Sequence, residues 1–114
     1  MEEDKYFQVQ TTASSREEAG KIADALLSSK ASACVKILPG GESYYHWQGK
    51  IEKASELLLL INTTASRYAE VEQIIKSIHS YENPEIIALK IKKGSPEYLG
   101  WIKNETGFAS RKGI

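Results

Sequence analysis

Apolar and polar side chains alternate from Tyr6 to Thr12, a pattern that predicts a β-strand with one buried face. In two later segments apolar side chains recur every three or four residues, which predicts amphipathic helices. The first is expected from about Arg16 to Ser29 with Ser14 or Ser15 as its cap, and the second follows a cap at Ser66. Because each helix has a single apolar stripe, both should cover the same face of a sheet.

The segment from Ala33 to Asn62 is rich in β-branched and aromatic residues and predicts a long β-ribbon. Pro39-Gly40-Gly41 is expected to bend the chain, and a short charged break is expected at Glu52-Lys53-Ala54-Ser55. Continuous alternation places Tyr45, Trp47, Gly49 and Ile51 on one face, and the other face then holds Tyr44, His46, Gln48 and Lys50. Neither face is mainly polar. The aromatic side chains therefore need a cover, which is either the ordinary core of the domain or, as we expect, a partner chain.

The segment from His79 to Pro84 is expected to end the second helix, because proline lacks an N–H and disfavours helix in the residue before it. Glu85 to Ile91 predicts the last long strand. Ser95 and Pro96 are typical of a helix start, here of a short helix with an apolar side formed by Tyr98, Leu99, Trp101 and Ile102. The polar residues 104–114 are expected to be unordered or loosely docked. This order of elements predicts an α+β fold of two β-α-β halves.

Length and charge are those of one small neutral domain. The chain has 114 residues, which predicts a single domain over 1–114 with an ordered core from about 5 to 103. Its 15 basic and 15 acidic residues balance, so we expect no binding to nucleic acid or to an anionic membrane. The single cysteine cannot form an internal disulfide, and the acidic N-terminus is unlike a signal peptide. A cytoplasmic location is therefore expected.

Candidate chemistry is restricted to few side chains. The sequence has only His46, His79 and Cys34 as imidazole or thiol ligands, too few for a complete transition-metal site in one chain. Cys34 lies in a predicted strand, where a free cysteine packs like a small apolar residue. His79 either caps a helix C-terminus or joins Glu82 and Glu85 in a weak cation site. Neither a Ser-His-Asp arrangement nor a glycine-rich phosphate loop is visible, so no enzyme is predicted.

Four segments resemble the CutA family, which is named for divalent-cation tolerance. They are Ala33-Cys34-Val35 with Ile37-Leu38-Pro39, Tyr45-x-Trp47-x-Gly49-Lys50-Ile51-Glu52, His79-x-Tyr81-Glu82-x-Pro84-Glu85-Ile86-Ile87-Ala88-Leu89, and Gly94-x-Pro96-x-Tyr98-Leu99-x-Trp101-Ile102. Their order and spacing match the family from about Tyr6 to Lys103. The resemblance implies a ferredoxin-like βαββαβ sandwich with a long β-ribbon and a short C-terminal helix, assembled as a tight homotrimer like that of the PII proteins.

The same resemblance implies where ligands would bind. Family metal candidates are a first-strand cysteine, at Thr11 here, and a turn that here keeps His79 but has Ile78 in place of a second histidine. The predicted metal ligands are His79 of that turn, its neighbours Glu82 and Glu85, and Cys34 as the one available thiol, with Cu²⁺ or another divalent cation weakly bound. A second group of residues is expected at a cleft between subunits. It either holds a small ligand or fixes how the two subunits align. Its members are Tyr44, Trp47, Lys50, Glu52 and Tyr98.

Three functions are compatible with this pattern. The first is a trimeric divalent-metal (copper) binding protein of metal-ion tolerance, without enzymatic activity. The second is a PII-like regulatory or scaffolding trimer with a small effector or an unidentified protein partner at its clefts. The third is an acylphosphatase, which ranks last because the loop Ala13-Ser14-Ser15-Arg16 has no glycine to cradle a phosphate.

Overall fold

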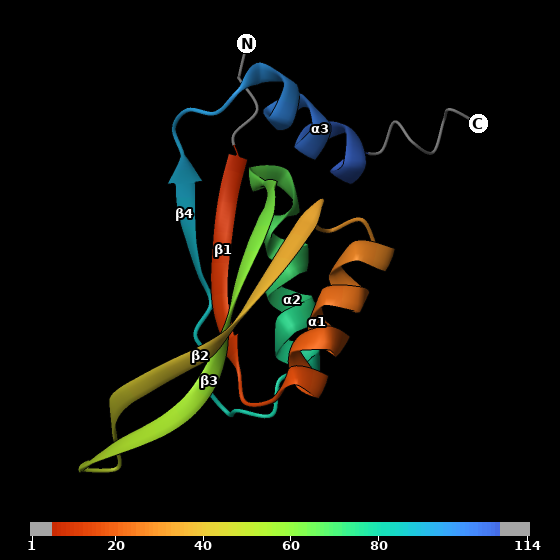
Figure 1. The fold of residues 1–114 in the computed structure, drawn as a ribbon. Coiled ribbons are helices and arrows are strands. Elements are labelled where there is room, and N and C mark those ends of the chain that lie inside the picture. The colour runs from red at the N-terminus through yellow and green to blue at the C-terminus, as the bar shows by residue number, and fades with distance from the viewer. Residues whose placement is uncertain (1–5, 108–114) are drawn as a thin grey trace.

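The computed structural model describes residues 6–107, which form a four-stranded antiparallel sheet with two helices packed on one face (Figure 1). The elements follow in the order β1 (Tyr6–Ala13), α1 (Arg16–Ser28), β2 (Cys34–Trp47), β3 (Lys50–Thr64), η1 (Ala65–Arg67), α2 (Tyr68–Ile78), β4 (Ile87–Ile91) and α3 (Pro96–Thr106). The strand order is β2-β3-β1-β4. This arrangement confirms the expected ferredoxin-like α+β fold with a long ribbon and a C-terminal helix.

The core lies between the sheet and helices α1 and α2. On β1 the side chains of Val9, Thr11 and Ala13 are fully buried, which confirms the alternation expected for this strand. The register places Val9 opposite Ile61 and Thr11 opposite Leu59 of β3, so one apolar surface extends across both strands. The helical stripes meet this surface with the buried side chains of Ala19, Ile22, Leu26, Val71 and Ile75. Both helices therefore cover the same face, as predicted.

The two helices begin differently. Ser15 caps α1, because its hydroxyl accepts a hydrogen bond from the backbone N–H of Glu18 at 3.1 Å. The expected cap of α2 by Ser66 is wrong. Residues Ala65–Arg67 form a 3₁₀ turn ahead of α2, so Ser66 lies inside a helical turn, and its hydroxyl is 3.1 Å from that of Thr64. No side-chain cap precedes α2.

The ribbon turns at Gln48 and Gly49, between the ends of β2 and β3. These residues have φ angles of 51° and 81°, as two-residue hairpin turns require, and the glycine adopts this geometry without steric cost. The expected bend at Pro39-Gly40-Gly41 is instead a bulge, because two residues of β2 lie between Leu38 and Gly41 where β3 has one. The expected charged break at 52–55 is also wrong, since these residues pair within β3.

The position of the turn changes which hairpin residues share a face. Trp47 lies opposite Lys50 and Tyr45 lies opposite Glu52, whereas Ile51 lies opposite His46. Directly paired residues of antiparallel strands project to the same side of a sheet. Lys50 therefore joins Tyr45 and Trp47, and Ile51 joins the opposite face, in contrast to the predicted assignment. The alternation used for that prediction does not continue through a hairpin turn.

The C-terminal part is more regular than expected. Ser95 caps α3 by accepting a hydrogen bond from the Tyr98 N–H at 3.1 Å, which confirms the predicted start at Pro96. The last strand begins at Ile87, two residues later than expected. Residues 104–106, expected to be part of a loose tail, continue α3, and the buried Arg67 side chain donates from Nε to the Thr106 carbonyl at 2.7 Å. Gly107 follows the end of α3, and residues 108–114 of that predicted tail lie outside the described residues.

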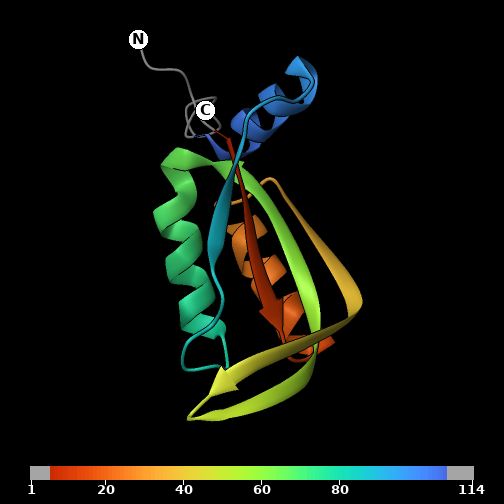
Figure 2. The same cartoon turned by 90° about the vertical axis from the view of Figure 1, so that its left-hand side faces the viewer.

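The hairpin and α3 mark opposite ends of an elongated molecule, with extents of 50 × 28 × 22 Å (Figure 2). The sheet face away from the helices carries exposed apolar side chains, among them Leu38, Ile87 and Leu89 at 42 to 48% exposure. On the hairpin, Tyr44 is 65% and Ile51 72% exposed. None of the described helices has the length and apolar character needed to cross a membrane.

Candidate functional site

A pocket of about 590 Å³ lies between the hairpin and the loop that follows α2. Its walls come from the end of β1, from β2 and β3 and from residues 81–85, which the fold brings together although they are far apart in sequence. The lining residues are Thr12, Ser43, Tyr45, His46, Trp47, Glu56, Tyr81, Glu82, Asn83, Pro84 and Glu85.

Strand alternation places most of the hairpin residues of this pocket on one face, with His46 as the exception. Ser43, Tyr45 and Trp47 are two residues apart along β2 and therefore project to the same side. Glu56 of β3 lies opposite Gly41, which belongs to the same alternating set. The hairpin consequently presents two aromatic rings, a hydroxyl and a carboxylate towards the loop after α2.

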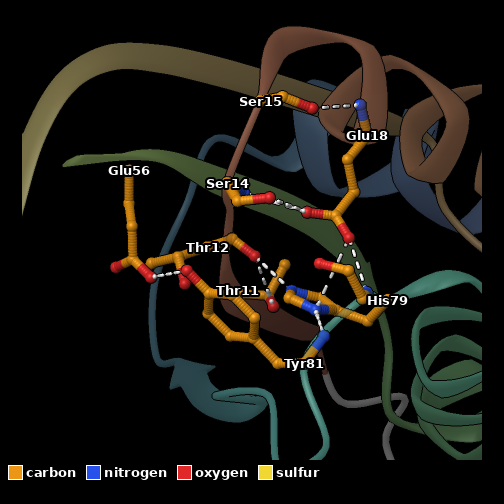
Figure 3. A network of polar contacts seen from close by, with 9 residues as sticks. Thr11, Thr12, Ser14, Ser15, Glu18, Glu56, His79 and Tyr81 are labelled. Carbon is orange, nitrogen blue, oxygen red and sulfur yellow. Dashed lines mark hydrogen bonds and ion pairs between the residues drawn. The ribbon is translucent and has the colours of Figure 1, made fainter. Parts of the chain in front are cut away.

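Glu56 joins the hairpin to that loop. Glu56 as a whole is 7% exposed, and its carboxylate accepts hydrogen bonds from the Ser43 hydroxyl and, at 2.7 Å, from the Tyr81 hydroxyl (Figure 3). Burial raises the pKa of Tyr81, and the hydrogen bond to Glu56 raises it further. Tyr81 therefore remains a protonated donor at neutral pH. The hydrogen bond between Tyr81 and Glu56 therefore holds the loop after α2 against the hairpin strands.

A second carboxylate, Glu18 of α1, holds the loop from behind. It accepts hydrogen bonds from the Ser14 N–H at 2.9 Å, the Ser14 hydroxyl at 3.0 Å and the Ser80 N–H at 2.6 Å (Figure 3). Burial alone would raise the pKa of Glu18, but the hydrogen bonds from Ser14 and Ser80 outweigh burial and lower it to about 2. The ionised carboxylate thus ties the start of α1 to the residue after His79.

His79 is buried behind the pocket with both ring nitrogens engaged. Nε2 lies 2.6 Å from the carbonyl oxygen of Thr12, and Nδ1 accepts the Tyr81 N–H at 3.0 Å (Figure 3). A carbonyl can only accept and an N–H can only donate, so this pattern fits a neutral ring with its proton on Nε2. The His79 side chain is 0% exposed. It terminates α2, as expected for a residue at a helix end, but its ring bonds to β1 rather than to helix carbonyls.

The structure separates the four predicted metal ligands. Glu82 and Glu85 are exposed and line the pocket, whereas His79 lies behind it. Cys34 lies at the other end of the sheet. It pairs with Asn62 of β3, and Asn62 pairs with Gln8 of β1. The His79 ring instead contacts the carbonyl of Thr12, four residues further along β1. That separation is roughly 13 Å along the strand. Among residues 6–107, no three His, Cys, Asp or Glu side chains are grouped to hold a metal ion.

The predicted cleft residues also divide between the two ends of the molecule. Trp47 lines the pocket, and Lys50 and Glu52 share its face of the hairpin. Tyr44 lies on the other face, with the Lys53 ammonium 5.8 Å from its ring centre. Tyr98 is at the far end, where its hydroxyl accepts a hydrogen bond from Asn62 at 3.1 Å. A single chain does not assemble this cleft.

Sequence analysis missed Glu56, Ser43 and Glu18 as site residues. Glu56 carried a usable signal, because it is a carboxylate that directly precedes the apolar run from Leu57 to Ile61 in a predicted strand. Glu18 follows Ser15 by three residues, which is the spacing of a capping box. Its side chain accepts from the N–H of Ser14, one residue before the cap, and from that of Ser80, a partner 62 residues away that no local pattern indicates.

An antiparallel ferredoxin-like sheet with an extended β2-β3 hairpin defines a class of small α+β proteins. The chain belongs to one family in this class, the CutA1 divalent ion tolerance proteins, whose family model matches residues 7–105. It is therefore a divalent-cation tolerance protein by family and not an enzyme.

Relatives and solved structures agree with this assignment. The divalent-cation tolerance protein CutA of Thermus thermophilus is 44% identical over 84% of this chain and 93% of its own length. A solved structure titled CutA from Xylella fastidiosa matches with a TM-score of 0.88 and 37% identity, over 90% of this chain and 98% of that one. The chloroplastic CutA protein of Arabidopsis thaliana is 43% identical over 86% of this chain, which spans 54% of that longer protein.

Proposed function

We propose that the protein is a cytoplasmic homotrimer that binds a divalent cation, Cu²⁺ in preference to other first-row ions, as part of metal-ion tolerance. The observation that supports cation binding is the negative charge of the pocket lining. Glu56, Glu82 and Glu85 line it, and none of its lining residues is lysine or arginine. Such a lining attracts cations and repels anions.

The exposed apolar surface supports the trimer. Leu38, Ile87 and Leu89 lie on the sheet face that the helices leave uncovered, and Trp47 is 44% exposed on the projecting hairpin. Apolar surface of this extent is typical of subunit interfaces. In a closed ring each hairpin contacts the next subunit, which would let the hairpin residues Tyr44, Trp47, Lys50 and Glu52 meet Tyr98 of a neighbouring copy.

Glu82 and Glu85 are the proposed metal ligands of the pocket. Both are exposed and follow the fixed segment His79-Ser80-Tyr81, so their backbone is held while their carboxylates stay accessible. Copper is preferred because divalent ions follow the Irving–Williams order, and binding is weak because the oxygen shell is incomplete. We assign His79 to positioning this loop, since direct coordination through Nδ1 would displace the Tyr81 N–H.

Calorimetric titration with Cu²⁺ tests the metal assignment. The double variant Glu82→Gln/Glu85→Gln should lose most of the affinity, whereas the matched control Glu97→Gln/Glu105→Gln on α3 should keep it. Cys34→Ser should also bind normally, because Cys34 is remote from the pocket. Unchanged binding in the Glu82/Glu85 variant, or lost binding in Cys34→Ser, would contradict the assignment.

Two additional readouts complete the test. A histidine-based site loses affinity as the pH falls below about 6.5, whereas a carboxylate site keeps it until about pH 4.3. We therefore expect copper binding to persist at pH 5.5 and to remain in His46→Ala. Light scattering coupled to size exclusion should give a trimer mass at micromolar concentration, with Trp47→Ala assembling less well. A monomer mass for the parent protein would refute the trimer.

The pocket volume favours a second candidate function. A site of about 590 Å³ is much larger than a metal ion and falls within the range of small-molecule sites, about 300–1,000 Å³. A regulatory trimer that binds a small effector at this place therefore stays a candidate beside metal tolerance.

A further inference from the structure

The two hydrogen bonds of the His79 ring respond differently to a second proton on the ring. Nε2 lies 2.6 Å from the Thr12 carbonyl, so it carries a proton in both the neutral and the charged ring. Nδ1 accepts the Tyr81 N–H at 3.0 Å, which is possible only while Nδ1 has no proton of its own (Figure 3). A second proton therefore preserves the contact with β1 and removes the contact with Tyr81.

The carboxylate of Glu18 offers an acceptor for that second proton. Its Oε2 is 3.7 Å from Nδ1 of His79 and already accepts the Ser80 N–H at 2.6 Å (Figure 3). A ring movement of roughly 1 Å would bring Nδ1 within hydrogen-bond distance. A carboxylate oxygen has two lone pairs, so Oε2 can accept from Ser80 and from a protonated Nδ1 at the same time.

Glu18 keeps its negative charge at every pH at which a histidine ordinarily titrates. Burial raises the pKa of Glu18, but the hydrogen bonds from Ser14 and Ser80 outweigh burial and lower it to about 2. Histidine is the side chain that ordinarily gains its charge between about pH 8 and pH 5. The acceptor for a charged His79 ring is therefore present throughout this range.

The other titratable groups near the ring are Tyr81 and the carboxylate behind it. The Tyr81 ring lies 4.8 Å from the His79 ring, centre to centre, and its hydroxyl donates to Glu56 of β3. Burial and the hydrogen bond to Glu56 raise the pKa of Tyr81, so this side chain stays neutral. Within the described part of the chain, the hydrogen bonds and the ion pair of His79 involve no lysine, arginine or second histidine. Glu18 is therefore the charge that pairs with the protonated ring.

We propose that His79 is a pH-sensitive switch that controls how firmly the loop after α2 is held. In the neutral state Nδ1 binds the Tyr81 N–H, and in the protonated state Nδ1 donates to Glu18 and releases that N–H. The N–H of Ser80 stays bound to Glu18 in both states. Because the Tyr81 hydroxyl ties the loop to Glu56, release of the Tyr81 backbone weakens the hold of the loop on the hairpin.

The switch is complete within one chain. The His79 side chain is 0% exposed, and all its partners belong to the same chain, so the proposal does not depend on what covers the hairpin. Ser80, the next residue, is exposed, so a local opening of the loop is enough to admit a proton. The proposal also goes beyond the metal function, because none of these contacts requires a metal ion.

Amide hydrogen exchange of the intact protein, followed residue by residue by NMR with a chelator present, tests the switch. Each rate is divided by that of an unstructured chain at the same pH, which removes the intrinsic pH dependence of exchange. Between pH 8 and pH 5 the protection of the Tyr81 N–H should fall by on the order of tenfold, the effect of about one hydrogen bond. The Ser80 N–H should stay protected. The ¹⁵N shift of His79 Nδ1 should show protonation with the same midpoint.

Three variants assign the effect to the ring. His79→Asn keeps an acceptor oxygen near the position of Nδ1 but cannot gain a proton, so the Tyr81 N–H should stay protected down to pH 5. Glu18→Gln removes the charge that pairs with the protonated ring, so the midpoint should move to lower pH. His46→Asn, which changes the exposed histidine of the hairpin, is the matched control and should behave as the parent protein.

Three results in the parent protein would overturn the proposal, so the test does not require any variant to fold. The first is equal loss of protection at Ser80 and Tyr81, which would mean that the whole loop opens. The second is unchanged protection of Tyr81 after the ¹⁵N shifts show a doubly protonated His79 ring. The third is a His79 ring that gains no second proton down to pH 5. Among the variants, a loss of Tyr81 protection in His79→Asn equal to that of the parent would have the same consequence.

Discussion

Glu18 should make the folded state sensitive to acid, and the structure indicates by how much. The residue is 9% exposed, and its carboxylate accepts hydrogen bonds from Ser14 and Ser80, which join α1 to the loop after α2. The pKa of Glu18 is lowered from 4.5 to about 2 in the folded protein. Each pKa unit corresponds to about 1.4 kcal/mol, so ionised Glu18 stabilises the folded state by about 3 kcal/mol at pH 7.

The sign of the pH dependence follows from the lowered pKa. A carboxylate with a lower pKa in the folded state than in the unfolded state stabilises the fold above the unfolded value, here 4.5. That contribution decreases as the pH falls and is lost near the folded value of about 2. The parent protein should therefore lose about 3 kcal/mol between pH 5 and pH 2 through this one group.

Urea denaturation at fixed protein concentration, repeated at several pH values, measures this effect. Glu18→Gln removes the titrating group, and its amide nitrogen cannot accept the Ser80 N–H, so the variant should be less stable at pH 7 and depend less on pH below 5. Glu17→Gln is the matched control, because Glu17 is the preceding, exposed residue of the same helical turn. Equal stability loss in acid for Glu18→Gln and Glu17→Gln would refute this role of Glu18.

Two further substitutions test the packing that positions the site. Ile75→Ala removes a fully buried side chain of α2 and should lower the free energy of unfolding by about 2–5 kcal/mol, as measured by denaturation; a loss near zero would mean that α2 does not pack as described. Ser95→Ala removes the cap of α3 and should cost about 1 kcal/mol, with faster amide exchange in the first turn of α3 and no change near His79; unchanged exchange at Tyr98 would contradict the cap.

Local patterns were sufficient to predict much of the fold. The stripe that includes Ile22 and Leu26 places α1 within one residue of its observed end, and the Ser95-Pro96 signal gives the first residue of α3. The extent of α1 and the start of α3 depend on residues three or four positions apart, so they can be predicted from the local sequence pattern. The ribbon turn was mislocated because Pro39-Gly40-Gly41 has stronger turn residues than Gln48-Gly49, although the latter pair supplies the two left-handed conformations that the hairpin needs.

The site was less predictable because its contacts join residues distant in sequence. Glu82 and Glu85 were identified as candidate cation ligands, and the structure places both at the pocket. The role of His79 depends on the Thr12 carbonyl and on the Tyr81 N–H, which occupy its two nitrogens. Neither contact can be inferred from the spacing of histidines and carboxylates. Only the fold shows that the imidazole is already used as a structural hydrogen-bonding group.

The most direct test of the proposed metal site is an anomalous difference map from a crystal soaked in Cu²⁺, with data collected at the copper absorption edge. The map should contain a peak inside the pocket next to Glu82 and Glu85, with His79 still bonded to the Thr12 carbonyl. A peak at Cys34 or on the His79 ring, or no ordered copper at any site while calorimetry shows saturable binding, would contradict the assignment of the cation to this pocket.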